Sequence, residues 1–266
     1  MRSAKRNRHL ASEGRASARP PSARSPRESA DVQKHVPPAS RPFVAATFAM
    51  TVDGKITTRT FSPVDFTSRE DKAHLHRHRS LGDAVLIGHS TLRRDNVRLG
   101  LPGTELREQR LARGQTPYPM RVIVSNEGRI DPGLKIFQSE ISPILIFSTT
   151  RMPRKFQDAL CKKATLHLDK SRSVDLAGML QQLRRDYKVR FVACEGGAEL
   201  FRSLLERDLV DQLNLTIAPV MFGGAAAPTL TGLSKEFLPV SVQCSLKEMR
   251  TVGDECFLTY RIKHQR

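Results

Sequence analysis

The residues best suited to chemistry in this sequence stand where apolar runs end. They fall in four short stretches, TVDGK (51–55), GHSTLRRD (88–95), SNEGR (125–129) and EGGAEL (195–200). The runs before them are typical of strands buried on both faces. Ligands of α/β sheets bind beyond the carboxyl ends of the parallel strands. The four stretches are therefore candidates for one shared site.

The stretch EGGAEL has the residues expected of a phosphate site. Gly196 and Gly197 would let the backbone approach a ligand closely before a helix begins. The free N–H groups and the dipole at the start of that helix favour an anion. Glu195 either caps the helix or holds a polar ligand group. The pattern is not the G-x-G-x-x-G fingerprint, so a purely structural turn stays open.

Two further stretches offer polar groups with structural alternatives. Thr91 and Asp95 lie four residues apart, on one face if the segment is helical; the alternative is a helix cap and a solvent-facing acid. Ser125, Asn126 and Arg129 could hold a nucleotide phosphate; the alternative is an ordinary Asx turn. No Ser-His-Asp order, P-loop or metal-ligand cluster is present, so a cofactor is expected to supply the reactivity.

The stretch TVDGK, taken by itself, is more simply explained as a turn than as the edge of a site. Asp53-Gly54 favours a turn between two strands. A turn alone does not account for an acid and the amine of Lys55 so close to the end of a buried strand. Asp53 either contacts a ligand or holds the turn that places Lys55.

The elements that must position these residues follow from periodicity. Strands are expected at residues 43–50, 83–88, 121–125, 143–149, 164–168, 189–194, 211–223, 240–248 and 255–262. Helices are expected at 71–80, 153–163, 175–186 and 196–210, with a helical turn at 89–95 and a surface loop at 100–119. Thr67 or Ser68 is expected to cap the first of these helices. The third is expected to be amphipathic, with an apolar stripe of Leu176, Met179, Leu180 and Leu183. This order predicts a three-layer α/β domain with a mostly parallel central sheet and antiparallel C-terminal strands.

The helix expected at 71–80 contains three histidines. His74, His76 and His78 lie two residues apart, so they are expected to fan over different faces rather than bind a metal together. The sequence favours a solvated helix face. The four cysteines form no C-x-x-C pair, which indicates a reducing compartment without a disulfide framework or a zinc site, and Cys194 is expected to be a buried thiol.

The chain of 266 residues carries a formal charge of +17, much of it near the start. Residues 1–40, rich in Arg, Ser, Ala and Pro, are predicted to be a disordered basic arm, and residues 41–266 the folded domain. The arm is a solvated tail, a transit peptide or a nucleic-acid-binding arm, the last being disfavoured because no aromatic residues interleave the basic ones. No apolar stretch is long enough to span a membrane.

Taken together, the motifs resemble one family. They stand in the order TVDGKI, RSLGDAVLIGHSTLRRD, VS, EGGAEL and VDQLNLTIAPVMFGG. This order is similar to that of the pyrimidine reductases of riboflavin biosynthesis, the C-terminal half of the bifunctional deaminase/reductase, whose fold is that of dihydrofolate reductase. The resemblance runs from about residue 43 to residue 262.

The resemblance implies an NADPH-dependent reduction in riboflavin biosynthesis. The ribosylamino group of a pyrimidine 5′-phosphate would become a ribitylamino group, with hydride added at C1′ of an opened, imine-like sugar. The substrate would be the aminouracil or the diaminopyrimidine. One alternative is a dihydrofolate reductase-like enzyme acting on another small substrate. The other is a basic protein that binds nucleic acid through its arm.

The resemblance also assigns expected roles to residues. The catalytic residues would be Lys55, Glu195 and Asp53. The residues contacting substrate would be Thr51, Arg79, Asp95, Leu99 and Glu195. The residues contacting the cofactor would be Met50, Thr91, Asp95, Ser125, Asn126, Gly196, Gly197, Ala198, Glu199 and Leu200.

Further expectations concern partners and departures from the family pattern. The H-x-E and P-C-x-x-C signature of the deaminase half does not occur, so a separate deaminase is expected. A homodimer is expected, located in the cytoplasm or in an organelle if residues 1–40 are a transit peptide. Val97 stands where the family usually has proline. The candidates for recognising the 2′-phosphate of NADPH are Asn126, Arg129 and Arg151.

Overall fold

The computed structural model describes residues 38, 40–58, 66–232 and 238–264. The basic arm predicted over residues 1–40 lies outside the described residues except at positions 38 and 40. The elements, in chain order, are β1 (Phe43–Thr51), α1 (Arg69–Leu81), β2 (Ala84–Gly88), α2 (His89–Asp95), α3 (Glu105–Ala112), β3 (Met120–Ser125), η3 (Lys135–Gln138), β4 (Ile144–Thr149), α4 (Arg154–Leu160), β5 (Thr165–Asp169), α5 (Leu176–Asp186), β6 (Phe191–Cys194), α6 (Ala198–Leu205), β7 (Gln212–Ala218), β8 (Gln243–Val252) and β9 (Glu255–Lys263).

The nine described strands form one sheet in the order β5-β4-β3-β2-β6-β1-β7-β9-β8. Every pairing from β5 to β7 is parallel. The pairings of β7 with β9 and of β9 with β8 are antiparallel. The predicted mostly parallel sheet with an antiparallel C-terminal edge is therefore confirmed.

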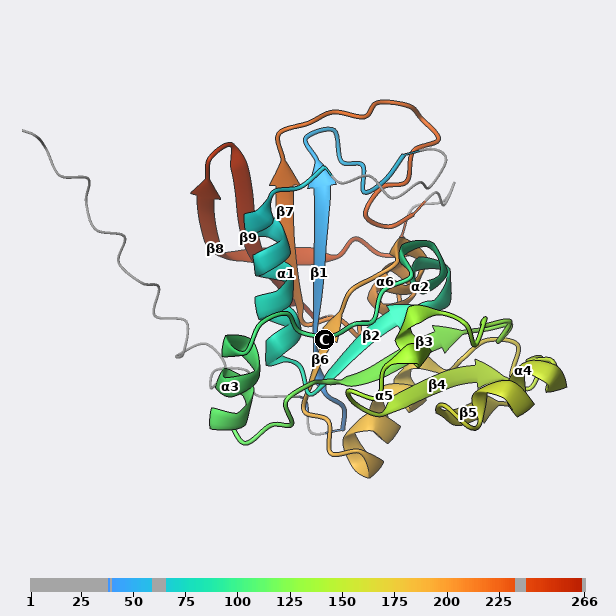
Figure 1. The fold of residues 1–266 in the computed structure, drawn as a ribbon. Coiled ribbons are helices and arrows are strands. Elements are labelled where there is room, and N and C mark those ends of the chain that lie inside the picture. Colours follow the sequence, from blue (N-terminus) through green and yellow to red (C-terminus); the bar gives the residue numbers. More distant parts are fainter. Residues whose placement is uncertain (1–37, 39, 59–65, 233–237, 265–266) are drawn as a thin grey trace, which may run out of the picture. The chain divides into compact units, whose positions relative to one another are not determined.

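Helices cover both faces of the sheet and complete the three layers (Figure 1). Helices α5 and α6 pack on one face, where the predicted α5 stripe of Leu176, Met179, Leu180 and Leu183 is buried. On the other face, side chains of α2, η3 and α4 pack against β2, β3 and β4. Helix α1 lies over β1 and β6 on this second face, beside α3. The two faces together bury the apolar residues of the parallel strands.

The surface loop predicted over residues 100–119 contains a helix, so that prediction was wrong for its middle part. The helix α3 has the sequence ELREQRLA, in which most residues are strong helix formers, and the glycines and prolines lie only at its flanks. Arg110 of α3 is fully buried and donates to the carbonyls of Ser80 and Gly82 at the end of α1. Helix α3 therefore satisfies carbonyl groups that α1 leaves without intrahelical partners.

The histidine face of α1 is not solvated, contrary to the sequence-based expectation. His74 is 7% exposed, and its ring lies 4.3 Å from that of His78, centroid to centroid. His78 contacts Asn214 of β7 through Nδ1, at 3.2 Å from the amide nitrogen. Residues four apart on a helix share a face, so His74 and His78 meet although neighbouring histidines do not. The sheet beneath this part of α1 has buried polar side chains, of which Asn214 contacts His78, whereas His74 Nε2 has no hydrogen-bond partner among the described residues.

The start of α1 confirms the predicted cap. The hydroxyl of Ser68 accepts hydrogen bonds from the backbone N–H groups of Glu70 and Asp71. Ser68 is held in turn by the buried carboxylate of Glu255 on β9, to which its backbone N–H donates at 2.9 Å. The first turn of α1 is thus fixed to the sheet.

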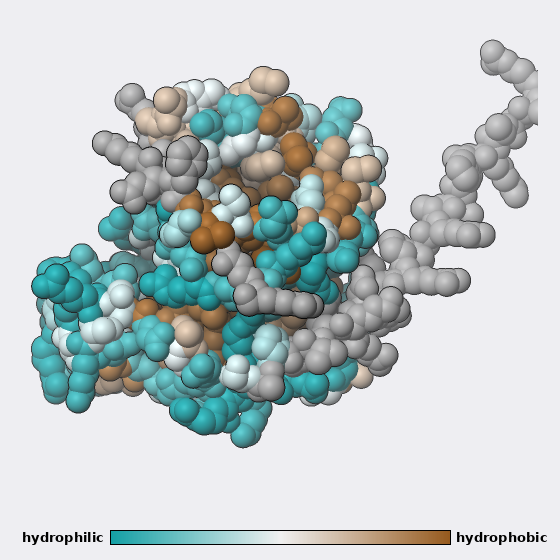
Figure 2. All heavy atoms as spheres, turned by 180° about the vertical axis from the view of Figure 1, so that it is seen from behind, coloured by the Kyte–Doolittle hydropathy of each residue, from teal (hydrophilic) through white to brown (hydrophobic). Residues whose placement is uncertain are grey.

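The surface of the described residues is mainly polar. Figure 2 shows hydrophilic side chains over much of one face, with hydrophobic ones gathered across its middle and upper part. No helix in the described part of the chain combines the length and the apolar character needed to cross a bilayer.

Candidate active site

A cleft of about 1480 Å³ opens at the carboxyl ends of the parallel strands. Its walls contain residues from the ends of β1, β2, β3 and β6 and from the starts of α2 and α6. Pockets for single small ligands measure about 300–1,000 Å³. The cleft therefore has room for two ligands side by side.

The floor of the cleft lies at the point where the order in which strands are added to the sheet reverses. After β2 the chain continues to β3, toward one edge of the sheet. After β6 it passes β1 and continues to β7, toward the other edge. The two strand ends are joined by hydrogen bonds from Glu195 N to Leu86 O at 2.9 Å and from Gly88 N to Gly196 O at 2.8 Å. Such switch points are where α/β proteins bind nucleotides.

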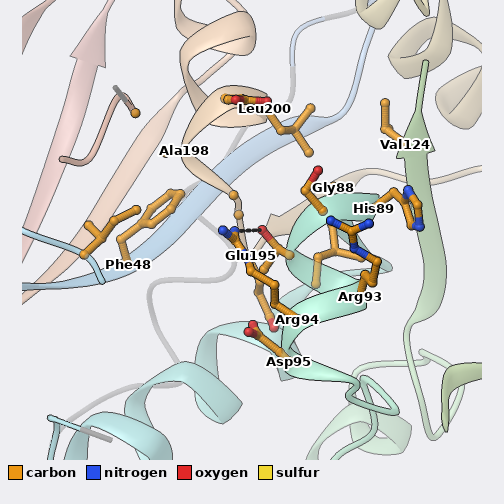
Figure 3. Close-up of a pocket in the computed structure, with 18 of the residues that line it drawn as sticks. Phe48, Gly88, His89, Arg93, Arg94, Asp95, Val124, Glu195, Ala198 and Leu200 are labelled. Carbon is orange, nitrogen blue, oxygen red and sulfur yellow. Dashed lines mark hydrogen bonds between the residues drawn. The ribbon is translucent and has the colours of Figure 1, made fainter. Parts of the chain in front are cut away.

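Two helices begin at this point without side-chain caps. Helix α2 follows Gly88 and α6 follows Gly197, and no described side chain caps either helix. Figure 3 shows Gly88 close to Leu200, with Ala198 beside it on α6. Uncapped first turns leave backbone N–H groups available to an anionic ligand.

The turn between β6 and α6 requires glycine at both positions. Gly196 has a φ of +105°, which favours glycine, and the Gly196–Gly197 peptide is cis. A Cβ atom at Gly197 would come within 2.3 Å of Thr91 Oγ1. The α2 and α6 helices therefore approach each other so closely that only glycine fits.

A buried ion pair lies beside the glycine turn. Arg79 of α1 donates from Nε and Nη2 to the two carboxylate oxygens of Glu195, each at 2.6 Å, and from Nη1 to Gly100 O at 2.6 Å. The side chains are 8% and 7% exposed. Burial alone would lower the pKa of Arg79, but the charge of Glu195 and its hydrogen bonds outweigh that effect and raise it. The pair holds Glu195 in one orientation at the floor of the cleft.

The cleft wall is rich in arginine. Arg93 and Arg94 of α2 lie near Asp95 in Figure 3, and Arg129 and Arg207 also line the cleft. Burial by the surrounding protein raises the pKa of Asp95, and the charge of Arg94 opposes this. This wall is suited to phosphate groups.

The family model described as "RibD C-terminal domain" matches residues 42–258 of the chain. This chain belongs to the RibD C-terminal domain family. The match covers almost the whole described domain, and the family-like motifs of the sequence all lie within it.

Relatives similar to this RibD-type chain carry reductase names. The 2,5-diamino-6-ribosylamino-4(3H)-pyrimidinone 5′-phosphate reductase of Methanothermobacter thermautotrophicus is 30% identical, over 84% of this chain and 99% of the relative. The protein of the same name from Archaeoglobus fulgidus is 29% identical, over 83% and 98%.

Solved structures with the same fold include a pyrimidine reductase-like protein from Corynebacterium diphtheriae, with a TM-score of 0.72 and 18% identity over 84% of this chain and 93% of that one. The riboflavin biosynthesis reductase Rib7 of Saccharomyces cerevisiae has a TM-score of 0.63 and 21% identity over 86% and 93%. These likenesses show that the RibD-type fold is shared.

Most residues assigned from the family resemblance line the cleft. They are Arg79, Thr91, Asp95, Leu99, Ser125, Asn126, Glu195, Gly196, Gly197, Ala198, Glu199 and Leu200. The described lining does not include Met50, Thr51, Asp53 or Lys55, although their neighbours Ala49 and Ile56 belong to it. The structure thus brings three of the four polar stretches together, and TVDGK is not part of the described lining.

The polar groups of TVDGK contact one another and the loop after β7. Thr51 donates its hydroxyl hydrogen to Asp53 and accepts from Lys55 N at 2.9 Å. Asp53 also accepts from the backbone N–H groups of Phe222 and Gly223, at 3.2 and 2.7 Å. The Thr51 hydrogen bond is the main cause that lowers the pKa of Asp53. This geometry favours the alternative in which Asp53 holds the turn.

Ser125 and Asn126 line the cleft and also stabilise the local chain. Ser125 Oγ accepts from Gly128 N at 3.1 Å, and Asn126 Oδ1 accepts from Val174 N at 3.0 Å. His89 approaches Ser125 with Nδ1 at 3.4 Å. Burial, aided by the charge of Arg93, lowers the pKa of His89, so the neutral ring is favoured there.

A group of cleft residues on α1 and β1 was not identified from the sequence. Asp71 and Leu75 line the cleft together with Arg79, and Phe48 contributes an aromatic ring from β1. A spacing of four residues places positions 71, 75 and 79 on one helix face, so this signal was available once Arg79 was assigned. Phe48 gave no such signal, because it lies inside a continuous apolar run.

Proposed function

We propose that this chain is a pyrimidine reductase of riboflavin biosynthesis that uses NADPH to convert a ribosylamino to a ribitylamino side chain. The observation that carries the proposal is the cleft at the switch point, in which two uncapped helix starts adjoin the buried Arg79–Glu195 pair. The names of the two relatives that are matched over 98–99% of their own length support the same reaction.

The half of the cleft beside α2 and α6 suits a dinucleotide. Its turn has no side chain at Gly88, Gly196 or Gly197, its helix starts offer free N–H groups, and Arg93 and Arg94 add positive charge. A pyrophosphate needs this combination of close backbone approach and cationic groups. When bound, the nicotinamide supplies a hydride.

The reaction also requires a proton and a stabilised cation. The C1′–O4′ bond of the sugar breaks, O4′ takes a proton, and the exocyclic nitrogen forms a C=N bond that carries a positive charge. A hydride at C1′ then gives the ribitylamino chain. We assign the Glu195 carboxylate, fixed by Arg79, to stabilise that positive charge electrostatically.

The choice between NADPH and NADH would depend on groups near the end of β3. Arg129 lines the cleft, whereas Arg151 is not part of its described lining. Both guanidinium groups lie 3.8 Å from Glu127 and are at least half exposed. The side-chain oxygen of Asn126 is engaged by the backbone. Of the three candidates, Arg129 is therefore the one we assign to the 2′-phosphate.

We further propose a homodimer in the cytoplasm that works with a separate deaminase. The two archaeal relatives carry only the reductase name and are matched over 98–99% of their length. The RibD protein of Actinobacillus pleuropneumoniae is matched over 58% of its length. We also propose, from the composition of the chain, that residues 1–40 form a basic arm attached to a folded domain of residues 41–266.

The test is a paired-substrate assay combined with ligand-induced stabilisation. Saturating NADPH should raise the Tm by mass action on the native state, and more than NADH does. NADPH oxidation is then followed with the diaminopyrimidinone and the aminouracil ribosyl phosphates in parallel. If neither nicotinamide nucleotide shifts the Tm and neither substrate is reduced, the proposed function is wrong.

A further inference from the structure

Asp71 is a buried carboxylate in the wall of the cleft. It is 9% exposed and lies in the first turn of α1. Within the described part of the chain, no lysine, arginine or histidine forms an ion pair with it. Burial raises the pKa of Asp71, while the nearby hydroxyls of Thr216 and Thr67 act in the opposite direction. A carboxylate has about four acceptor positions, and Thr216 Oγ1 has no hydrogen-bond partner among the described residues, so Asp71 keeps acceptor capacity toward the cleft.

The other carboxylates of the described lining differ from Asp71. Glu195 uses both oxygens on Arg79. Glu127 and Glu199 are exposed to solvent, and Asp95, whose carboxyl is partly desolvated although the residue is exposed, has the charge of Arg94 near it. A buried, acceptor-rich carboxylate without a cation is costly unless a donor group binds to it. Asp71 is therefore the acid best placed to receive N–H groups from a ligand.

The position of Asp71 along α1 identifies which part of a substrate it can meet. Asp71, Leu75 and Arg79 follow one another at intervals of four residues and all line the cleft. Asp71 lies about 12 Å along the helix axis from Arg79, at a rise of about 1.5 Å per residue. A phosphate would be repelled by Asp71, so it belongs near the arginines of α2. The heterocycle then lies at the Asp71 end, with the apolar side chains of Leu75 and Phe66 lining the wall beside it.

We propose that Asp71 binds the N3–H and 2-amino edge of the pyrimidine and makes this enzyme select a 2-amino-4-oxopyrimidine over the corresponding uracil. This inference rests on the proposed function and specifies its substrate. In such a ring N3 lies directly across from C6, which carries the sugar amine. With the sugar at Glu195, the N3–H and 2-amino groups point away from it, toward Asp71.

The two candidate rings differ at C2, which carries an amino group in one and a carbonyl oxygen in the other, and at N1, which bears a hydrogen only in the uracil. The diaminopyrimidinone presents two adjacent donors, which match the two oxygens of a carboxylate. The uracil presents N3–H beside the C2 carbonyl oxygen, and that oxygen would face a carboxylate oxygen without a hydrogen between them. Selection for the 2-amino ring places the reduction before the step that hydrolyses the amino group away.

The experiment compares kcat/KM for both ribosyl phosphates in the wild type, in Asp71→Asn and in a control, Glu70→Gln. Glu70 is the neighbouring carboxylate on α1; it contacts Arg77 and does not line the cleft. The asparagine variant keeps the shape, accepts from N3–H and donates to a C2 carbonyl. We expect the wild type to prefer the diaminopyrimidinone at least 10-fold. In Asp71→Asn, kcat/KM for that substrate should fall about 100-fold while the uracil substrate gains. The ratio should stay at the wild-type value in Glu70→Gln.

Three results would overturn the inference. The first is a wild type that reduces both rings equally or prefers the uracil. This result is measured without any variant, so it does not depend on a variant folding. The second is an Asp71→Asn protein in which both substrates lose activity in the same proportion. The third is failure of the reaction itself: a wild type that oxidises NADPH with neither substrate removes the proposed function and this inference with it. A wild type that is active but unselective removes only the inference.

Discussion

The Arg79–Glu195 pair should couple the stability of the domain to its activity. Changing Glu195 to Gln leaves the guanidinium of Arg79 buried without its counter-charge, and changing Arg79 to Met does the reverse. Breaking a buried pair by removing one partner costs about 3–5 kcal/mol. For a domain of this size, about 2–4 °C of Tm is lost per kcal/mol, so each single variant should lose roughly 6–20 °C. Because both groups are almost fully buried, solvent screening does not reduce this cost.

A double-mutant cycle measures the coupling directly. Urea unfolding of the wild type, the two single variants and the Arg79→Met/Glu195→Gln double variant gives four free energies of unfolding. The double variant holds no uncompensated charge, so it should be less destabilised than the two single losses combined, by at least about 2 kcal/mol. It should still be inactive, because Glu195 is absent from the cleft floor.

Additive losses would refute the reasoning. If the double variant were destabilised by the full combined amount, the two side chains would not interact as the 2.6 Å contacts indicate. A double variant that regained normal turnover would show that Glu195 has no role in the reaction. An exposed pair such as Arg185–Asp186 provides the control cycle, with an expected coupling below about 1 kcal/mol.

Four further predictions follow from the same structure. Gly197→Ala should destabilise the protein by about 1–3 kcal/mol and abolish stabilisation by NADPH. Adding Thr91→Ala to this variant should restore the Tm, because it removes the oxygen that the new Cβ would contact at 2.3 Å. If the Tm is not restored, that collision is not the cause of the loss. Lys55 is not part of the described cleft lining, and its catalytic role is implied by the family resemblance alone. On that expectation, Lys55→Ala should reduce turnover far more than Tm, because the backbone hydrogen bonds of Lys55 are kept. Equal effects on turnover and Tm would make Lys55 structural. Arg129→Ala should raise KM for NADPH and leave KM for NADH unchanged, measured in parallel titrations, and an equal rise for both would exclude a 2′-phosphate contact. Burial, followed by the charges of Arg250 and Arg77, lowers the pKa of His74 from 6.5 to about 4, so the native state favours the neutral ring. About 3 kcal/mol of stability that is present above pH 6.5 should therefore be lost as the pH falls toward 4. Urea unfolding over this pH range should show a smaller loss for His74→Gln than for the wild type.

Local patterns predicted most of the fold because they act over short range. The four-residue stripe of α5 and the Ser68 cap of α1 are confirmed at the predicted positions. The misassigned segment, α3, has a helix-forming sequence between glycines and prolines, and its composition as a whole suggested a loop. What stabilises α3 there is Arg110, which binds carbonyls of α1 some 30 positions away in the chain. Such a contact leaves no periodic signal.

The sequence by itself determined which residue types could form a site: glycines before a helix, an acid beside them, and polar groups after buried strands. The tertiary structure decided which of them meet. Strand order brings Gly88 and Gly196 within hydrogen-bond distance and places Arg79 on Glu195, because β6 inserts between β1 and β2. It also keeps Asp53 and Lys55 out of the described cleft lining, since their turn contacts the loop after β7 instead. Asp71 lines the cleft because the packing of α1 on the sheet turns that face of the helix toward it. No local sequence pattern specifies this packing.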